Sequence, residues 1–320
     1  MSGKWRKSLL FLGESLKRRG TPLSLSRWDR EGWTRGLGLP RGGPVVLYTG
    51  LLYQMAPHAK VLLGRRERVQ ALEEVLPEGW LRALQARVDL AGFLSRALFP
   101  YRLHRLYWEP LRAVVRLLQA AGLRVGYLYE KDLYPGTLAY ELGFFEAFLR
   151  QALRVRRVLE EAGVQVLITV DPHTTHLLRK VYPEVLPRGF KFEVRHYLEV
   201  LAESPLVKGG SGEEEVVLHE GCVWARGLGL SELPEEVLSS VGFAVKRPHY
   251  TGKTIYCCGG PVEGLFPEKA RAVAQKRIAQ LQAVGQKVAT ICPICHLNLS
   301  AVAPEDLTIR DLALWLKTKL

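Results

Sequence analysis

Short apolar runs alternate along the chain with longer stretches in which apolar residues recur at helical spacing. Residues 45–51 and 216–222 each begin with an apolar run that leads to a glycine, a pattern typical of a buried strand entering a tight turn. Residues 144–162 and 267–284 carry apolar positions three and four apart and are each followed by a glycine, as amphipathic helices often are. This alternation predicts an α/β fold with parallel strands joined by right-handed crossovers.

The strand and helix signals occur twice, in the same order. Residues 122–136 in the first half of the chain, which begin with a strand at 122–125, correspond to 242–259 in the second, and residues 164–174 correspond to 285–295. We therefore expect two pseudo-repeated domains, each a small, mainly parallel sheet flanked by helices. The first domain carries a helical insertion at residues 52–117, in which Leu81, Leu84, Val88, Ala91, Leu94 and Leu98 mark an amphipathic helix.

A charged, glycine-rich stretch predicts the boundary between the repeats. Residues 208–212 read Lys-Gly-Gly-Ser-Gly and are followed by three glutamates, a composition typical of a linker. The predicted organisation is a basic N-terminal extension at 1–40, a first domain at 41–207 and a second domain at 208–320.

Composition limits the class of protein. The 320 residues are 48% apolar and 24% charged, which is typical of a folded chain and argues against long disordered regions. No stretch approaches the roughly 20 apolar residues of a membrane-spanning helix, and residues 9–13 are too short for the core of a secretory signal. We expect a cytoplasmic protein, either free or bound peripherally to the inner face of the membrane.

The net charge of +13 is concentrated in two segments. Residues 1–40 carry nine Lys/Arg against three Asp/Glu, and residues 58–117 carry eleven against six, so the rest of the chain is nearly neutral. Such charge favours binding to nucleic acid, to an anionic membrane or to an acidic partner subunit. Residues 4–19 place Trp5, Leu9, Leu12 and Leu16 on one helical face among basic residues, and residues 99–108 mix aromatic residues with arginine. Both segments suit a membrane interface, or a basic helix packed on the protein itself.

All five cysteines lie in the second half, in the pattern C-x34-CC-x33-C-x2-C. They are Cys222, Cys257, Cys258, Cys292 and Cys295. Each falls at the carboxyl end of a predicted strand or in the loop after it, so a parallel sheet would bring them to one edge. In a reducing compartment such a pattern is more typical of metal binding than of disulfides.

The number of thiols favours a metal cluster over a single ion. Four thiolates already satisfy a zinc ion or a cubane cluster, and two adjacent cysteines point in different directions on an extended backbone. Gly221, Gly259 and Gly260 would let the backbone approach the sulfurs closely. Structural zinc and buried structural thiols remain as alternatives.

The cysteine pattern resembles that of the CCG cysteine-rich domain, found in heterodisulfide reductase and in the iron-sulfur subunits of several other oxidoreductases. The similarity covers roughly residues 41–320 and is most specific after residue 214. It implies a pair of CCG domains and assigns the five cysteines as ligands of one [4Fe-4S]-type cluster. In heterodisulfide reductase the clusters of these domains are noncubane. It also implies a subunit that needs partner chains and relays electrons between a flavin or ferredoxin-like partner and a thiol/disulfide or quinone acceptor.

The first repeat departs from this pattern at each ligand position. The corresponding residues are Leu51, Tyr134, Pro135, Asp171 and Thr174. Leucine and proline side chains cannot ligate a metal, so we expect a degenerate CCG-like domain without a cluster. The sequence therefore predicts one cluster in this chain rather than two.

Several histidines are further candidates. Asp171, His173 and His176 form a group with metal-compatible side chains, although Asp171 as a helix cap beside partly exposed histidines is the simpler interpretation. His219 and His296 lie near cysteines and could donate hydrogen bonds to sulfur, or could be ordinary buried histidines.

The sequence contains no dinucleotide-binding glycine motif and no Walker loop, so any flavin would come from a partner. The leading hypothesis is an iron-sulfur electron-transfer subunit of an oxidoreductase complex. The alternative, based on the basic charge, is a zinc-stabilised adaptor or nucleic-acid-binding module.

Overall fold

The computed structural model describes residues 4–64, 102–206, 210–260 and 262–320. The amphipathic helix predicted at 81–98 lies outside the described residues.

The described strands form two separate four-stranded sheets, and every pairing is parallel. The first sheet has the strand order β2-β1-β3-β4 and the second has the order β6-β5-β7-β8. The strands are β1 (Val45–Tyr48), β2 (Gly126–Tyr127), β3 (Val166–Thr169), β4 (Glu193–His196), β5 (Gly210–His219), β6 (Val241–Lys246), β7 (Lys287–Thr290) and β8 (Thr308–Asp311). The two sheets have the same topology, which confirms the predicted pair of α/β repeats. The strand expected at residues 122–125 is short and begins at residue 126, as β2.

The helices also recur in matching order. The described α-helices are α1 (Lys4–Arg19), α2 (Arg27–Glu31), α3 (Leu52–Gly64), α7 (Arg102–Ala120), α8 (Thr137–Glu141), α9 (Phe145–Glu161), α10 (Pro172–His176), α11 (Tyr182–Val185), α12 (Tyr197–Ala202), α13 (Leu233–Ser240), α14 (Pro267–Gln282), α15 (Pro293–Ser300) and α16 (Leu312–Lys317). The described residues also include two π-helical segments, η3 (Leu177–Val181) and η4 (Val223–Leu228). Helix α7 precedes β2 as α13 precedes β6, so α7 has a counterpart in the second half.

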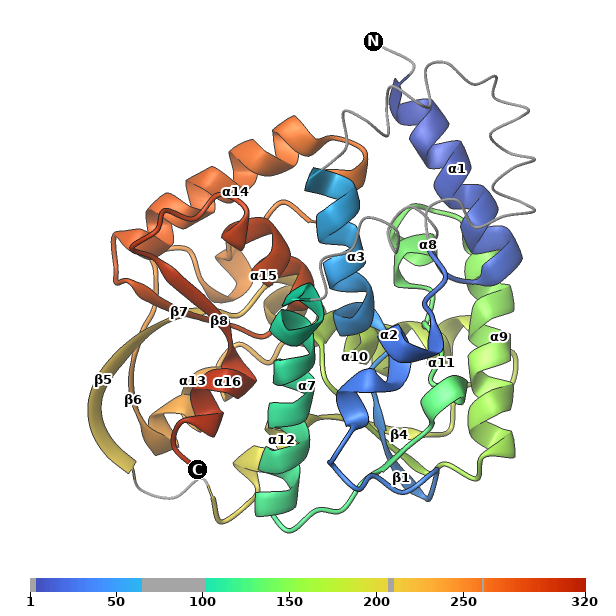
Figure 1. The fold of residues 1–320 in the computed structure, drawn as a ribbon, viewed down its shortest axis with the longest axis horizontal. Helices are drawn as coiled ribbons and strands as arrows, with labels where there is room; N and C mark the ends of the chain where they lie inside the picture. The colour runs from blue at the N-terminus through green and yellow to red at the C-terminus, as the bar shows by residue number, and fades with distance from the viewer. Residues whose placement is uncertain (1–3, 65–101, 207–209, 261) are drawn as a thin grey trace.

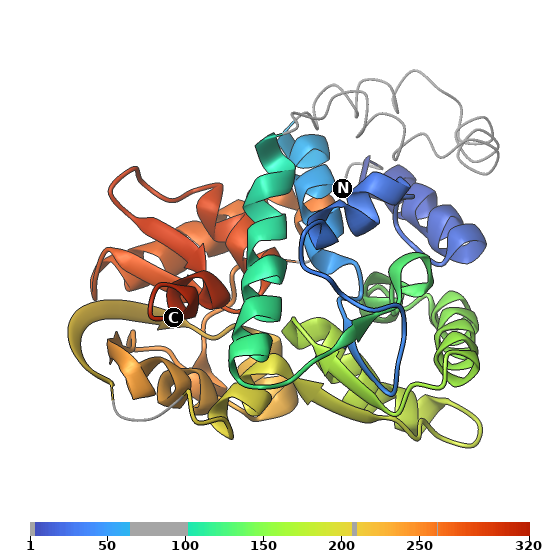
Figure 2. The same cartoon turned by 60° about the horizontal axis from the view of Figure 1, so that its bottom comes forward.

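The halves pack against each other through reciprocal contacts. Helix α3, which follows β1, contacts α15, while η4, which follows β5, contacts α10. In the same way α7 contacts α16, and α12 contacts α13. Helices α3 and α7 lie between the two sheets in both views (Figures 1 and 2). Equivalent elements therefore meet across a pseudo-two-fold axis, with the carboxyl ends of both sheets facing the centre.

One apolar core spans the interface between the halves. It contains Leu111 and Leu118 of α7, Leu198 of α12, and Leu218 and Trp315 of the second half, all nearly inaccessible to solvent. A hydrogen bond of 2.5 Å from the Tyr53 hydroxyl to Asp311 also crosses the interface. Burial of this kind is the main stabilising contribution to a folded domain, at roughly 25 cal/mol per Å² of apolar surface.

The described parts of the two segments suited to a membrane interface contribute buried side chains to the core. Helix α1 contacts α9, and Leu16 is 1% exposed in the core of the first half. In α7, Tyr107 and Trp108 are 1% and 8% exposed. These aromatic rings therefore belong to the core. Among the described helices, none is both long and apolar enough to cross a bilayer.

Candidate metal centre

Cys222 follows the central strand of the second sheet. Strand β5 ends at His219, and the chain turns at Gly221, whose φ of 79° lies in the left-handed region that favours glycine. Cys222 is then the N-cap of η4. A methyl group at position 221 would lie 3.5 Å from the Cys295 sulfur, so the turn passes directly beside the sulfur group.

Cys257 and Cys258 lie in the loop that follows β6. Two hydrogen bonds hold the segment that leads to these cysteines. Glu220 accepts one of 2.9 Å from the Thr251 hydroxyl, and Arg226 donates one of 2.9 Å to the carbonyl of Ile255. The next residue, Gly259, has a φ of 92°, and its N–H lies 3.4 Å from the Cys257 sulfur. A backbone donor therefore already points at a sulfur, as happens around cluster ligands.

Cys292 and Cys295 begin the helix that follows β7. Cys292 is the N-cap of α15 and Pro293 takes the first helical position, where a missing N–H costs nothing. Cys295 lies one turn further along, so both sulfurs share the same end of the helix.

The structure thus brings all five cysteines to the carboxyl edge of neighbouring strands β6, β5 and β7. The Cys222 and Cys257 sulfurs lie 4.0 Å apart. The pKa of Cys258 is raised by its neighbour Cys257, and the pKa of Cys295 is raised by its neighbours Cys258 and Cys292. No disulfide joins them. Three are buried and two, Cys222 and Cys257, are partly accessible. The site is therefore open on one side.

The sulfurs are spread more widely than a single ion requires. A tetrahedral zinc ion with Zn–S bonds of about 2.3 Å holds its sulfurs about 3.8 Å apart. Within the described part of the chain, no three cysteine sulfurs lie mutually within 4.8 Å. The donor set therefore fits a larger, polynuclear centre better than one ion.

The pKa values of the cysteine thiols are shifted in opposite directions. Hydrogen bonds from Cys222 and Cys258 lower the pKa of Cys257 to about 2, and the same bonds raise the pKa of both donors. Burial raises the pKa of Cys292, but the hydrogen bond from Cys295 and the charge of His173 outweigh burial and bring it well below its usual value. The lowered pKa values of Cys257 and Cys292 favour the thiolate form that binds metal.

The first half, which contains no cysteine, contributes a histidine beside this site. His173 on α10 interacts electrostatically with Cys292, and its Nδ1 lies 2.8 Å from Oε1 of Glu141. Burial lowers the pKa of His173, but the charges of Glu141 and Cys292 outweigh it and raise the pKa well above its usual value. A Glu141–His173–Cys292 relay therefore connects the two halves. The expectation that His173 is partly exposed is wrong, because α10 packs against η4 and leaves the side chain 7% exposed.

This relay could not be found from sequence, since only the packing of the halves brings Glu141 and His173 to Cys292. His176 is half-buried and faces the same region: a methyl group at Gly227 would lie 2.9 Å from its ring. A cavity of about 250 Å³ opens here, lined among others by His173, His176, Cys222 and Arg226.

The counterpart positions in the first half make structural contacts. Asp171 is the N-cap of α10 and accepts a 2.9 Å hydrogen bond from the Thr174 N–H, as the simpler interpretation held. The pKa of Asp171 is raised to about 6 by burial. A methyl group at Gly50 would lie 2.3 Å from Thr174 Oγ1, the same relation that Gly221 has to Cys295. The two halves therefore correspond position by position, with Thr174 where Cys295 stands.

The remaining counterpart residues have structural roles. The Tyr134 hydroxyl accepts from the N–H of Leu138, the Pro135 carbonyl accepts from the Tyr182 hydroxyl, and Leu51 is 6% exposed in the apolar core.

The two histidines near cysteines contact other groups. Arg277 donates a 3.1 Å hydrogen bond to His219, and burial lowers the pKa of His219 to about 3. His296 packs edge-on against the Tyr107 ring at 5.5 Å, and burial lowers its pKa to about 4. Both histidines are therefore neutral at pH 7. Their described contacts support the interpretation as ordinary buried histidines.

The fold and the site define a class of protein: a pseudo-repeated α/β chain with a five-cysteine centre at the sheet edge of its second half. Residues 216–300 match the family model of the CCG cysteine-rich domain. The matched residues include all five cysteines.

Curated relatives are similar over much of the chain. A probable membrane-anchored ferredoxin of Chromohalobacter salexigens is 27% identical over 71% of this chain and 35% of its own length. The probable iron-sulfur-binding oxidoreductase FadF of Bacillus subtilis is 30% identical over 56% of this chain and 26% of its own length. The EtfAB:quinone oxidoreductase of Syntrophomonas wolfei is 29% identical over 63% of this chain and 31% of its own length. This chain matches about a third of the length of these relatives.

Proposed function

We propose that the chain is an iron-sulfur electron-transfer subunit of an oxidoreductase complex, with one [4Fe-4S]-type cluster held by Cys222, Cys257, Cys258, Cys292 and Cys295. The observation that carries the proposal is the convergence of all five thiols on one sheet edge, at spacings wider than one ion requires. The relatives named for iron-sulfur binding support the same cofactor.

A cluster at this place would accept and release single electrons. The protein's part is to hold it, to tune it and to limit its contact with water. The Gly259 N–H donates a hydrogen bond to the Cys257 sulfur and His173 places its charge beside Cys292, while burial of Cys258, Cys292 and Cys295 keeps most of the site dry.

The electron acceptor would bind on the open side of the site. A cavity beside Cys222 leaves room for a thiol/disulfide or quinone acceptor, and the relative named EtfAB:quinone oxidoreductase supports the quinone. A flavoprotein or ferredoxin-like subunit would deliver the electrons. The basic segments 1–40 and 58–117 are the proposed contacts with an acidic partner or an anionic membrane surface.

Metal and sulfide analysis after anaerobic purification tests this function. We expect a brown protein with about four irons and four labile sulfides per chain, which changes its EPR spectrum on reduction. Cys257→Ser should lose most of the iron, because a serine oxygen is a poor substitute for a thiolate in such a centre.

Thr174→Ser is the matched control, since Thr174 occupies the counterpart of Cys295 in the first half and should leave the iron content unchanged. A colourless protein with one zinc bound to sulfur would contradict the proposal and favour the zinc-stabilised adaptor. About eight irons per chain would contradict the prediction of one cluster.

A further inference from the structure

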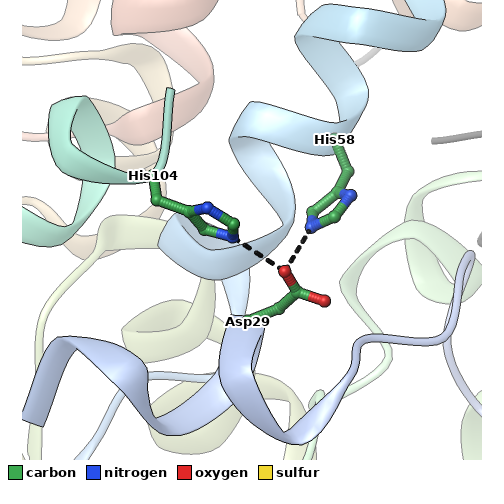
Figure 3. A group of neighbouring side chains, drawn as sticks. All are labelled: Asp29, His58 and His104. Atoms are coloured by element: carbon green, nitrogen blue, oxygen red, sulfur yellow. Dashed lines mark hydrogen bonds and ion pairs between the residues drawn. The ribbon is translucent and has the colours of Figure 1, made fainter. Parts of the chain in front are cut away.

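A second group of metal-compatible side chains lies in the first half. Asp29 on α2, His58 on α3 and His104 on α7 meet in the interior, and their ligand atoms all lie within 4.8 Å of one another (Figure 3). His104 Nε2 is 2.7 Å and His58 Nε2 is 3.2 Å from the same carboxylate oxygen, Asp29 Oδ1. In the described part of the chain, this is the only group of three such residues at this spacing.

The three residues come from separate elements and are shielded from water. Their side chains are 4%, 0% and 6% exposed for Asp29, His58 and His104. Helix α3 contacts both α2 and α7, which holds the three helices together at this point. The site is therefore formed by tertiary packing rather than by a local sequence motif.

A second layer of contacts orients the carboxylate. Asp29 Oδ2 accepts hydrogen bonds from the Ser26 N–H at 2.8 Å and from the Ser26 hydroxyl at 2.6 Å, as part of the capping box of α2. This leaves Oδ1 directed at the two imidazoles (Figure 3). Metal sites commonly hold a ligating carboxylate in this way, with one oxygen hydrogen-bonded and the other free to bind.

The chemistry of the group suits a borderline divalent metal. Two imidazole nitrogens and one carboxylate oxygen make up the protein ligands of many zinc sites, whose fourth position is open. Zinc bonds of about 2.0–2.1 Å place neighbouring ligand atoms roughly 3.3 Å apart. The His58 distance already has this value, and the His104 distance needs to lengthen by about half an ångström.

We propose that Asp29, His58 and His104 bind one zinc ion, which links α2, α3 and α7. Hydrogen bonding alone would require both imidazoles to carry a proton on Nε2, whereas zinc binding requires the Nε2 lone pairs of both. The two states thus differ in what Asp29 Oδ1 contacts, a proton or a metal, and can be separated by measurement. This site is distinct from the five cysteines and does not depend on the proposed electron-transfer function.

The test uses the full chain purified anaerobically, equilibrated with zinc and freed of excess by gel filtration. We expect about one zinc per chain, with zinc-edge X-ray absorption showing nitrogen and oxygen neighbours at about 2.0–2.1 Å and no sulfur shell near 2.3 Å. His58→Gln and Asp29→Asn should each weaken zinc binding at least 100-fold in competition with a chromophoric chelator.

His249→Gln is the control, because His249 is exposed and lies in no such group; it should bind zinc like the parent chain. The spectrum of the parent protein needs no variant and stays informative if a variant fails to fold. A sulfur shell would place the zinc at the cysteines and overturn the proposal, and so would a parent chain that binds no zinc. Iron and sulfide are measured on the same samples, so loss of the cluster is distinguished from loss of zinc.

Discussion

The cysteine site depends on a single residue of the half that lacks cysteines. His173 is buried between Glu141 and Cys292, and the charges of both keep its imidazole protonated. A positive hydrogen-bond donor at a ligand sulfur stabilises the more negative, reduced form of a cluster. The first half therefore has an electrostatic role beside the cysteine site although it contains no cysteine.

Replacing His173 by glutamine should lower the reduction potential of the cluster. Loss of the positive charge favours the oxidised form, and we expect a shift on the order of 50 mV to more negative values, about a sevenfold change in the equilibrium for one electron. An EPR-monitored redox titration measures it. His176→Gln is the matched control, since His176 lines the same cavity without a described bond to Cys292. Equal potentials in the parent and H173Q would contradict this role.

At the scale of elements, the strand ends and their turns position the ligands. Each cysteine group follows a strand of the second sheet, and glycines allow the chain to turn where a side chain would collide. Gly259 is the strictest case: its φ is 92°, and a methyl group there would lie 2.4 Å from the carbonyl oxygen of Ala270 in α14.

Gly259→Ala should therefore destabilise the chain. A left-handed alanine costs about 1–2 kcal/mol and the overlap with α14 about 1–3 kcal/mol more, so we expect a loss of roughly 2–5 kcal/mol. Urea denaturation of the metal-free proteins measures the loss. Gly264→Ala is the control, because that position is open and its φ is not in the left-handed region. A similar midpoint for both variants would show that the loop relaxes freely.

At the scale of the whole molecule, the two halves share one core. Apolar residues of α7 and α12 pack with those of β5 and α16, and the reciprocal helix contacts cross the pseudo-two-fold axis. Separating the halves would expose this surface to water, at a cost of roughly 25 cal/mol per Å². The repeats are therefore not independent domains in energetic terms.

The metal-free chain should accordingly unfold in one transition. Circular dichroism and tryptophan fluorescence should give coincident denaturation curves, because Trp33 reports on the first half while Trp224 and Trp315 report on the second. Two separated transitions would contradict a shared core.

Much of the architecture was predictable because it is local. Residues 45–48 are continuously apolar and residues 166–169 are apolar except for Thr169, as is typical of strands covered on both faces, and α9 follows from apolar residues on one helical face. Strand β2 was placed a few residues early, because two residues of strand leave almost no pattern. The roles of Tyr107 and Trp108 were open from sequence, since a buried aromatic and one at an interface look alike.

The sequence by itself determined the repeat and the cysteine edge, because periodicity and strand-end position are properties of short segments. It also predicted a resemblance to the CCG cysteine-rich domain that is most specific after residue 214, and the family match over residues 216–300 confirms this resemblance. Only the tertiary structure decided that His173 and Glu141 lie against Cys292, and that Asp29, His58 and His104 converge. Those contacts join residues far apart in the chain, and they exist because apolar burial docks one half on the other and α2 and α7 on α3.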